Sequence, residues 1–187
     1  MKKTIAEKPL TFPENLVLIG MFGSGKSTLG RLLVQKLRYS FVDVDLLIEA
    51  KYKKPLHKVL ESLGIKRFMK MEDETIQALQ YWHCVIAPGG SAVYYPKAMK
   101  HLKTLGPLVY LKAGLGELKR RLPNWSNRSV VCRGGNTISA LFHERAPLYR
   151  KYADITEETK GKSNEIIAAQ ILKSLGWVQK PSLPGPR

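Results

Sequence analysis

The apolar positions of this chain fall into short compact runs, separated by longer stretches in which they recur with helical spacing. The compact runs are typical of buried strands and lie at residues 16–19, 41–45, 84–87, 108–111 and 154–156. Helical spacing covers residues 26–37, 137–152 and 164–175. Strands that alternate with amphipathic helices predict a parallel sheet with helices on both faces. We therefore expect an α/β fold, a three-layer sandwich around a parallel five-stranded sheet.

Two sections interrupt this regular order. Between residues 46 and 80 the pattern is helical but is broken by Pro55 and Gly64, as expected of short helices set off from the main sheet. Residues 119–133 carry five basic side chains and no acidic one, together with Pro123. We interpret this second section as a flexible loop.

The length of 187 residues suffices for one α/β domain with a substantial core. We place this single domain at residues 16–176. Residues 1–15 are polar and are expected to form a flexible leader, and the Pro-rich residues 177–187 are expected to be disordered.

A complete phosphate-binding loop (P-loop) follows the first apolar run. Residues 20–27 read Gly-Met-Phe-Gly-Ser-Gly-Lys-Ser and lead directly into the first helical stretch. The glycines let backbone N–H groups turn around phosphates, the lysine reaches the terminal phosphate oxygens, and the last hydroxyl binds magnesium. The expected nucleotide-binding residues are Gly23, Ser24, Gly25, Lys26, Ser27 and Thr28. The motif predicts binding of a nucleoside triphosphate with Mg²⁺.

Two further groups fall at the carboxyl ends of the predicted strands, where ligands of parallel sheets collect. Asp43 and Asp45 end the second strand, and Gly89 and Gly90 follow the third. Two acids at this spacing point the same way from an extended strand, one nearer the metal and one further along the cleft. If the chain leaves the strand at Asp45, these two roles are separated.

The charge of the chain favours anionic partners. Lys and Arg number 31 against 15 Asp and Glu, a formal net charge of +16. ATP, a carboxylated substrate, nucleic acid and an acidic membrane surface all satisfy this charge. The basic residues are dispersed and no RNA- or DNA-binding module is present, so nucleic acid is not the favoured partner.

Localisation follows from apolar run length and from cysteine usage. No apolar run approaches the roughly 18 residues that span a membrane. Cys84 lies in a predicted strand and Cys132 in the basic loop, a pairing that does not suggest a disulfide framework. We expect a cytoplasmic monomer that binds small molecules and no membrane.

Four segments together resemble the shikimate kinase family. They are the P-loop, the Asp-Val-Asp run at 43–45, Pro-Gly-Gly-Ser-Ala-Val at 88–93 and Arg-Ala-Pro-Leu-Tyr at 145–149, in that family's order and approximate spacing. The resemblance implies a P-loop NTPase fold of the nucleoside-monophosphate-kinase type. It also implies transfer of the ATP γ-phosphoryl group to the 3-hydroxyl of shikimate, giving shikimate 3-phosphate in chorismate biosynthesis.

The resemblance further implies roles for single residues. Asp45 matches the acid that contacts shikimate hydroxyls and accepts the proton, and Asp43 matches the acid that supports magnesium through water. Gly89 and Gly90 match the glycines that lie against the substrate. Arg145 matches an arginine that grips the shikimate carboxylate, which suits a planar bidentate donor.

A substrate-binding section at about 46–80 and a closing lid at about 119–136 complete the implied enzyme. Arg128 resembles the lid arginine that stabilises charge in the transition state, together with Lys26 of the P-loop. Loop lengths vary in this region, so Arg120, Arg121 and Arg133 remain alternatives for this role.

The chain departs from the family pattern at two positions. The usual Phe-Arg-x-x-Glu run here has Met69 in place of the arginine, and Ser91 replaces the third glycine of a triplet. Loss of one charge-assisted contact predicts binding of shikimate that is weaker by about tenfold to more than a hundredfold. Lys66, on the same helical face as Met69, is the first candidate for compensation and Lys70 the second. Serine at position 91 causes little backbone strain if its φ is negative and serious strain if its φ is positive.

Three other functions stay open at this point. One is a related kinase whose acceptor lacks a carboxylate, which Met69 would tolerate. Another is an ATP-dependent or regulatory binding module without catalysis. The third is a nucleic-acid-binding protein, for which steep salt dependence of polynucleotide binding would be diagnostic.

Overall fold

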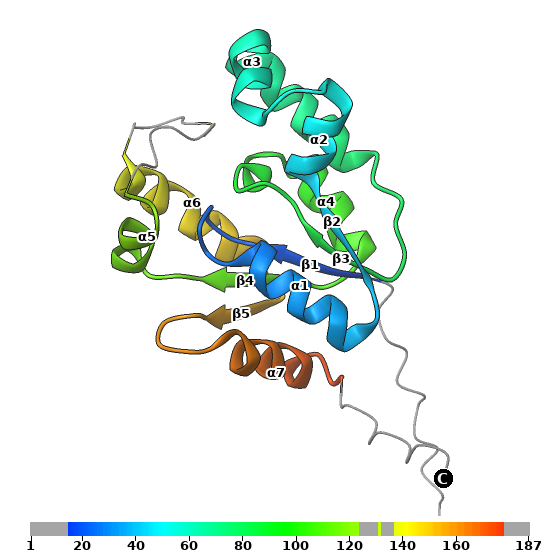
Figure 1. Ribbon diagram of the computed structural model, residues 1–187, viewed down its shortest axis with the longest axis vertical. Coiled ribbons are helices and arrows are strands. Elements are labelled where there is room, and N and C mark those ends of the chain that lie inside the picture. Colours follow the sequence, from blue (N-terminus) through cyan, green and yellow to red (C-terminus); the bar gives the residue numbers. More distant parts are fainter. Residues whose placement is uncertain (1–14, 124–130, 132–136, 178–187) are drawn as a thin grey trace, which may run out of the picture.

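Five parallel strands form the sheet of the computed structural model, as the sequence predicts (Figure 1). The structure describes residues 15–123, 131 and 137–177. The strands are β1 Asn15–Ile19, β2 Ser40–Asp43, β3 Cys84–Ala87, β4 Leu108–Lys112 and β5 Ile155–Glu158. Their order is β2-β3-β1-β4-β5. The connection from β1 leads to β2 and the connection from β3 leads to β4, so the two run in opposite directions across the sheet. This arrangement opens a crevice at the carboxyl ends of β1 and β3.

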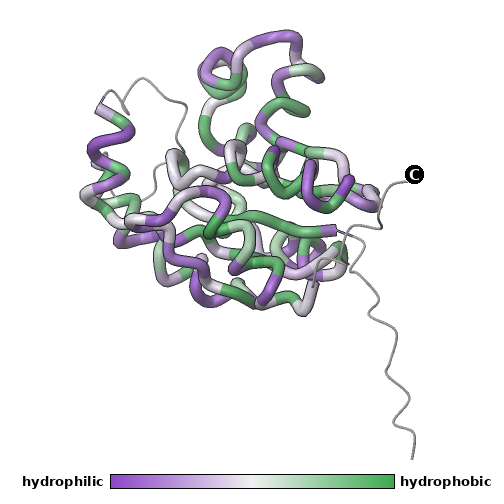
Figure 2. The backbone as a smooth tube through the Cα atoms, turned by 60° about the horizontal axis from the view of Figure 1, so that its bottom comes forward, coloured by the Kyte–Doolittle hydropathy of each residue, from purple (hydrophilic) through white to green (hydrophobic). Residues whose placement is uncertain are grey.

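Helices cover both faces of this sheet. They are α1 Lys26–Leu37, α2 Val44–Tyr52, α3 Leu56–Gln77, α4 Pro96–Leu105, α5 Leu115–Arg121, α6 Ile138–Tyr152 and α7 Asn164–Ser174, with a short 3-10 helix η1 Ala92–Tyr94. Alternate strand residues face opposite layers. Leu16 and Leu18 belong to a buried cluster with α1 and α7, whereas Val17 and Ile19 belong to one with α4 and α6. Burial on both sides explains the uninterrupted apolar runs, and Figure 2 shows a hydrophobic strand running between helices of mixed character.

Helices α2 and α3 lie apart from the sheet, as the interrupted pattern predicts (Figure 1). Helix α2 ends at Tyr52 and is followed by Lys53, whose φ of 52° is left-handed, and α3 begins directly after Pro55. Gly64 has a φ of 71° and a ψ of 160°, and it kinks α3. Only glycine adopts such backbone angles without strain, so the break follows from its lack of a side chain.

The second strand was expected at 41–45, but it begins one residue earlier and ends two residues earlier. Strand β2 ends at Asp43, whose side chain accepts a hydrogen bond from the N–H of Asp45 and caps α2. An Asp at this position satisfies one of the free N–H groups of the first turn. Val44, apolar and β-branched, is instead the first residue of the helix.

Several elements were not predicted. Helix α4 and η1 follow the glycine segment, and α5 contains residues 119–121, which we had assigned to a loop. Three basic residues in the last turn of α5 suit the negative end of the helix dipole. The rest of the expected lid, residues 124–130 and 132–136, lies outside the described residues.

Two residues just outside the expected domain limits of 16 and 176 are buried in the structure. Asn15 is buried, donates its amide to the carbonyls of Tyr81 and Leu105, and accepts from the N–H of Cys84. Trp177 is buried in the cluster beneath α7. A polar residue at a strand start can thus be a structural part of the core when its side chain satisfies backbone groups. None of the helices within 15–123 and 137–177 has the length and apolar character needed to cross a membrane.

Candidate active site

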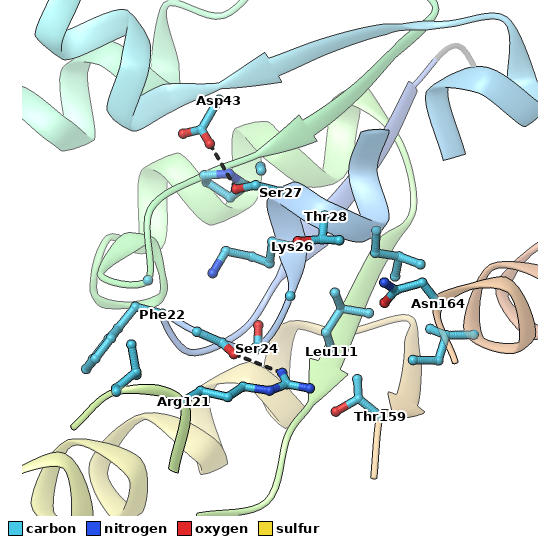
Figure 3. Close-up of a pocket in the computed structure, with 18 of the residues that line it drawn as sticks. Phe22, Ser24, Lys26, Ser27, Thr28, Asp43, Leu111, Arg121, Thr159 and Asn164 are labelled. Carbon is cyan, nitrogen blue, oxygen red and sulfur yellow. Dashed lines mark hydrogen bonds between the residues drawn. The ribbon is translucent and has the colours of Figure 1, made fainter. Parts of the chain in front are cut away.

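A cavity of about 460 Å³ opens at the carboxyl ends of the strands (Figure 3). The P-loop, the acids that follow β2, the loop after β3 and the segment between β5 and α7 all line it. The crevice expected from the strand order therefore contains most of the side chains that the sequence singled out.

The P-loop ends in a helix N-terminus that is free to bind an anion. Gly23 and Gly25 have φ values of 75° and 100°, which favour glycine, and Gly25 precedes α1 without a side-chain cap. The first N–H groups of α1 therefore remain available to phosphate oxygens, at the positive end of the helix dipole. Ser24, Ser27 and Thr28 line the same cavity, which brings together all six predicted nucleotide-binding residues.

Lys26 is poised for an anionic ligand. Its Nζ donates to the carbonyl oxygens of Gly20 at 2.9 Å and Met21 at 3.0 Å. Burial lowers the pKa of Lys26 to about 8, although Asp45 and Asp43 partly oppose this shift. Two neutral carbonyls compensate a buried ammonium less than an anion does, so a phosphate would stabilise the charged form.

Two oxygen groups lie together beside the P-loop. Ser27 Oγ donates to Asp43 Oδ2 at 3.2 Å, and Figure 3 shows the two side chains facing each other. Asp45 lies in the first turn of α2 rather than on the strand, so the change of element separates it from Asp43. Burial, with the neighbouring Asp43, raises the pKa of Asp45 to about 6.

The glycines after β3 approach two charged side chains. A Cβ at Gly89 would lie 2.7 Å from Asp45 Oδ1, and a Cβ at Gly90 would lie 3.1 Å from Arg145 Nη1. Arg145 is 1% exposed and donates to the hydroxyl of Tyr94 and the carbonyl of Val131. The glycines therefore let the loop pass between an acid and an arginine that are far apart in the sequence.

A family model described as Shikimate kinase matches residues 22–176. The chain belongs to the shikimate kinase family. A shikimate kinase of Thermodesulfovibrio yellowstonii is 36% identical over 163 residues, which cover 86% of this chain and 94% of that protein. One of Nitrosomonas europaea is 32% identical over 168 residues, covering 88% and 80%. The shikimate kinase of Acinetobacter baumannii, solved in complex with shikimate, has a TM-score of 0.77 at 29% identity and covers 87% of this chain and 92% of its own.

Four residues expected in a shikimate kinase site are not among the described residues that line the cavity: Gly89, Arg145, Arg128 and Lys66. Gly89 and Arg145 are described but lie next to lining residues, Gly89 beside Asp45 and Arg145 beside Gly90. Arg128, like its alternative Arg133, lies outside the described residues. Lys66 is exposed on α3, and neither it nor the partly buried Met69 is among the described residues that line the cavity. Their roles remain predictions.

The structure adds one residue that was expected only as an alternative and four that sequence reasoning did not select. Arg121, an alternative for the lid arginine, lines the cavity and donates to the carbonyl of Gly23 at 3.0 Å. Phe22, Thr159, Lys162 and Asn164 line it as well. The last three follow β5, and their position after a parallel strand was the signal that could have identified them.

Proposed function

We propose that this chain is a shikimate kinase, which transfers the γ-phosphoryl group of ATP to the 3-hydroxyl of shikimate. The observation that carries this proposal is the cavity that holds Lys26 of the P-loop together with Asp45, a partly buried carboxyl group beside the glycine loop. Such a site can hold a triphosphate and present an acceptor hydroxyl in line with it. The structural likeness to the Acinetobacter baumannii enzyme, which was solved with shikimate, supports the choice of acceptor.

Magnesium fits the nucleotide end of the cavity. Mg²⁺ prefers hydroxyl, carboxylate, phosphate and water oxygens, which the paired Ser27 and Asp43 can supply. The residues described contain no cluster of three or more His, Cys, Asp or Glu that would cage a metal. We propose that the ion is held mainly by nucleotide and water oxygens. Ser27 would bind it directly, and Asp43 would bind it through a water molecule. When bound, the ion neutralises charge on the β- and γ-phosphates.

Shikimate is proposed to lie between Arg145 and Asp45. Arg145 would bind the carboxylate, Gly89 and Gly90 would contact the ring, and Asp45 would accept a hydrogen bond from the 3-hydroxyl. The hydroxyl oxygen forms a bond to the γ-phosphorus as the bridging bond to the β-phosphate breaks, and the hydroxyl proton passes to Asp45. With a pKa of about 6, Asp45 is mostly ionised at neutral pH and can accept this proton. Lys26 stabilises the charge that develops on the transferring group.

The finer assignments are proposals of the same kind. Residues 46–80 would form the substrate-binding section, residues 119–136 the lid that carries Arg128, and residues 16–176 a single domain flanked by two tails. Lys66 would compensate only in part for the arginine that is missing at Met69. We further propose that the protein acts as a cytoplasmic monomer in chorismate biosynthesis.

The test is ADP release with Mg²⁺ and ATP while shikimate is titrated, in the native protein and in Asp45→Asn. Native turnover should saturate with shikimate, and the variant should lose at least about a hundredfold in kcat, as removal of a general base does. Asp73→Asn, at a residue of α3 that is not among the described residues lining the cavity, is the matched control and should keep native kinetics. Absence of shikimate-dependent turnover with ATP still bound would favour another acceptor or a non-catalytic module.

A further inference from the structure

A buried carboxyl group lies behind the glycine loop and takes no direct part in the proposed reaction. Glu72, on α3, is 4% exposed. Its two oxygens accept hydrogen bonds from Ser91 Oγ at 2.8 and 2.9 Å, and one also accepts from the hydroxyl of Tyr95 at 2.5 Å. Ser91 and Tyr95 are also buried, and both follow Gly90 in the chain. Glu72 therefore ties the section formed by α2 and α3 to the loop after β3.

Each residue of the loop 89–91 lies against a different charged side chain. A Cβ at Gly89 would come 2.7 Å from Asp45 Oδ1 and 3.4 Å from Glu72 Oε1, and one at Gly90 would come 3.1 Å from Arg145 Nη1. Ser91 itself bonds to Glu72. Because only one residue separates Ser91 from Gly89, a shift of the serine moves the glycines relative to both Asp45 and Arg145.

The two departures from the family pattern meet at this carboxyl group. Position 69 lies three residues before Glu72 on α3, so an arginine there would share its face of the helix. Met69 has no donor to offer. Ser91, the other departure, has a φ of −82°, which costs a serine no strain, and it supplies a donor to the same carboxylate. Lys70, the next basic residue, is instead paired with Glu74 and is largely exposed.

We propose that Glu72 is a positioning residue for shikimate, which through Ser91 and Tyr95 fixes Gly89 and Gly90 between Asp45 and Arg145, and that Ser91 takes the place of the missing arginine as its partner. This inference rests on the proposed shikimate kinase activity. The direction of the pKa shifts agrees with it, because burial raises the pKa of Glu72 to about 7 while the bonds from Tyr95 and Ser91 lower it. Removing either hydroxyl leaves a buried acid with fewer donors.

The test uses Ser91→Ala and Tyr95→Phe in the full chain, each of which deletes one hydroxyl. We expect either change to raise the KM for shikimate three- to tenfold while the KM for ATP stays within twofold of native. Thr75→Val is the matched control, because that hydroxyl lies on the same helix but donates to the carbonyl of Met71. It should leave both constants unchanged.

A double-mutant cycle tests whether Ser91 has replaced the missing arginine as the partner of Glu72. Met69→Arg is introduced into the native protein and into Ser91→Ala, and the factor by which it lowers the KM for shikimate is compared. This factor should be at least threefold larger in Ser91→Ala, because the carboxylate of Glu72 has lost the serine donor and can pair with the new arginine. If Met69→Arg changed the KM for shikimate by the same factor in both backgrounds, the replacement of the arginine by Ser91 would be refuted.

The outcomes separate this inference from the proposed function. Native turnover of shikimate with an unchanged KM in both hydroxyl variants would overturn the positioning role and leave the kinase assignment intact. An equal rise of the KM values for shikimate and for ATP would indicate a general loss of order in the site, and this would also overturn the positioning role. No native turnover of shikimate would remove the kinase assignment and this inference together. If Ser91→Ala melts too low to assay, Tyr95→Phe decides the positioning role alone.

Discussion

Binding of nucleotide should weaken above about pH 8, because Lys26 must be protonated to bind phosphate. Its Nζ donates to two neutral carbonyls, and burial lowers its pKa from 10.5 to about 8. Phosphate oxygens would replace the carbonyls and favour the charged form, returning the pKa toward its ordinary value. Above pH 8 the free protein has lost this proton whereas the complex keeps it, so binding takes up a proton.

The size of the effect follows from linkage. With a free-state pKa of about 8, about one tenth of the molecules carry a protonated Lys26 at pH 9, so the Kd for Mg·ADP should rise about tenfold between pH 7 and pH 9. At pH 9 binding should take up close to one proton. The rise continues by about tenfold per pH unit until the pKa of the complex is reached.

Isothermal titration calorimetry measures both quantities. The Kd for Mg·ADP is determined at pH 7, 8 and 9, and the proton uptake at pH 9 follows from two buffers of different ionisation enthalpy. Lys26→Met should bind weakly at every pH without this dependence, and Lys36→Met, an exposed lysine of the same helix, should retain it. A native Kd that is equal at pH 7 and pH 9 would refute the reasoning, as would an unchanged dependence in Lys26→Met.

Further predictions concern catalysis, substrate affinity and stability. Gly89→Ala should lower kcat at least tenfold with little loss of thermal stability, because the new Cβ would meet the end of the Asp45 side chain at 2.7 Å. Steady-state kinetics together with a melting curve would separate the effect on kcat from the effect on stability. The pH profile of kcat/KM for shikimate should fall on the acid side with a midpoint near the Asp45 pKa of about 6, since the protonated acid cannot accept the hydroxyl proton, and a flat profile from pH 5 to 8 would contradict this. Met69→Arg should lower the KM for shikimate about tenfold by restoring a charge-assisted contact, and an unchanged KM would show that the missing arginine is already compensated. Gly106→Ala should destabilise the fold by about 1–3 kcal/mol in urea unfolding, because its Cβ would lie 2.2 Å from the backbone oxygen of Asn15, which cannot rotate away.

The parallel sheet and the nucleotide end of the site were predictable because their signals are local. The P-loop fixes its own strand, turn and helix within one short segment, and strands buried on both faces appear as uninterrupted apolar runs. The position of Asp45 was harder to predict, because Val44 continues the apolar run of β2 although it is already helical. Asp43 carried the contrary signal, since an Asp is a preferred N-cap residue.

Helix α4 was missed although its signal was present. Pro96 occupies the first turn, and Ala98, Met99 and Leu102 recur at helical spacing on its buried face. The partners of Glu72 could not be predicted in the same way. Ser91 and Tyr95 lie 19 and 23 residues further along the chain, and only the packing of α3 against η1 and the loop before it brings them to this carboxyl group.

The two acids at Gly89, the partly buried Asp45 and the buried Glu72, differ in a way that assigns their roles. Burial is the main cause of the raised pKa in both, to about 6 in Asp45 and about 7 in Glu72. At neutral pH Asp45 is therefore mostly ionised, while Glu72 is about half protonated and adds less negative charge beside it. Environments that separate the pKa values of neighbouring acids commonly separate their roles. The acid that lines the cavity is the one that keeps its charge, as a proton acceptor must, and the acid bonded to Ser91 and Tyr95 is left to hold the loop.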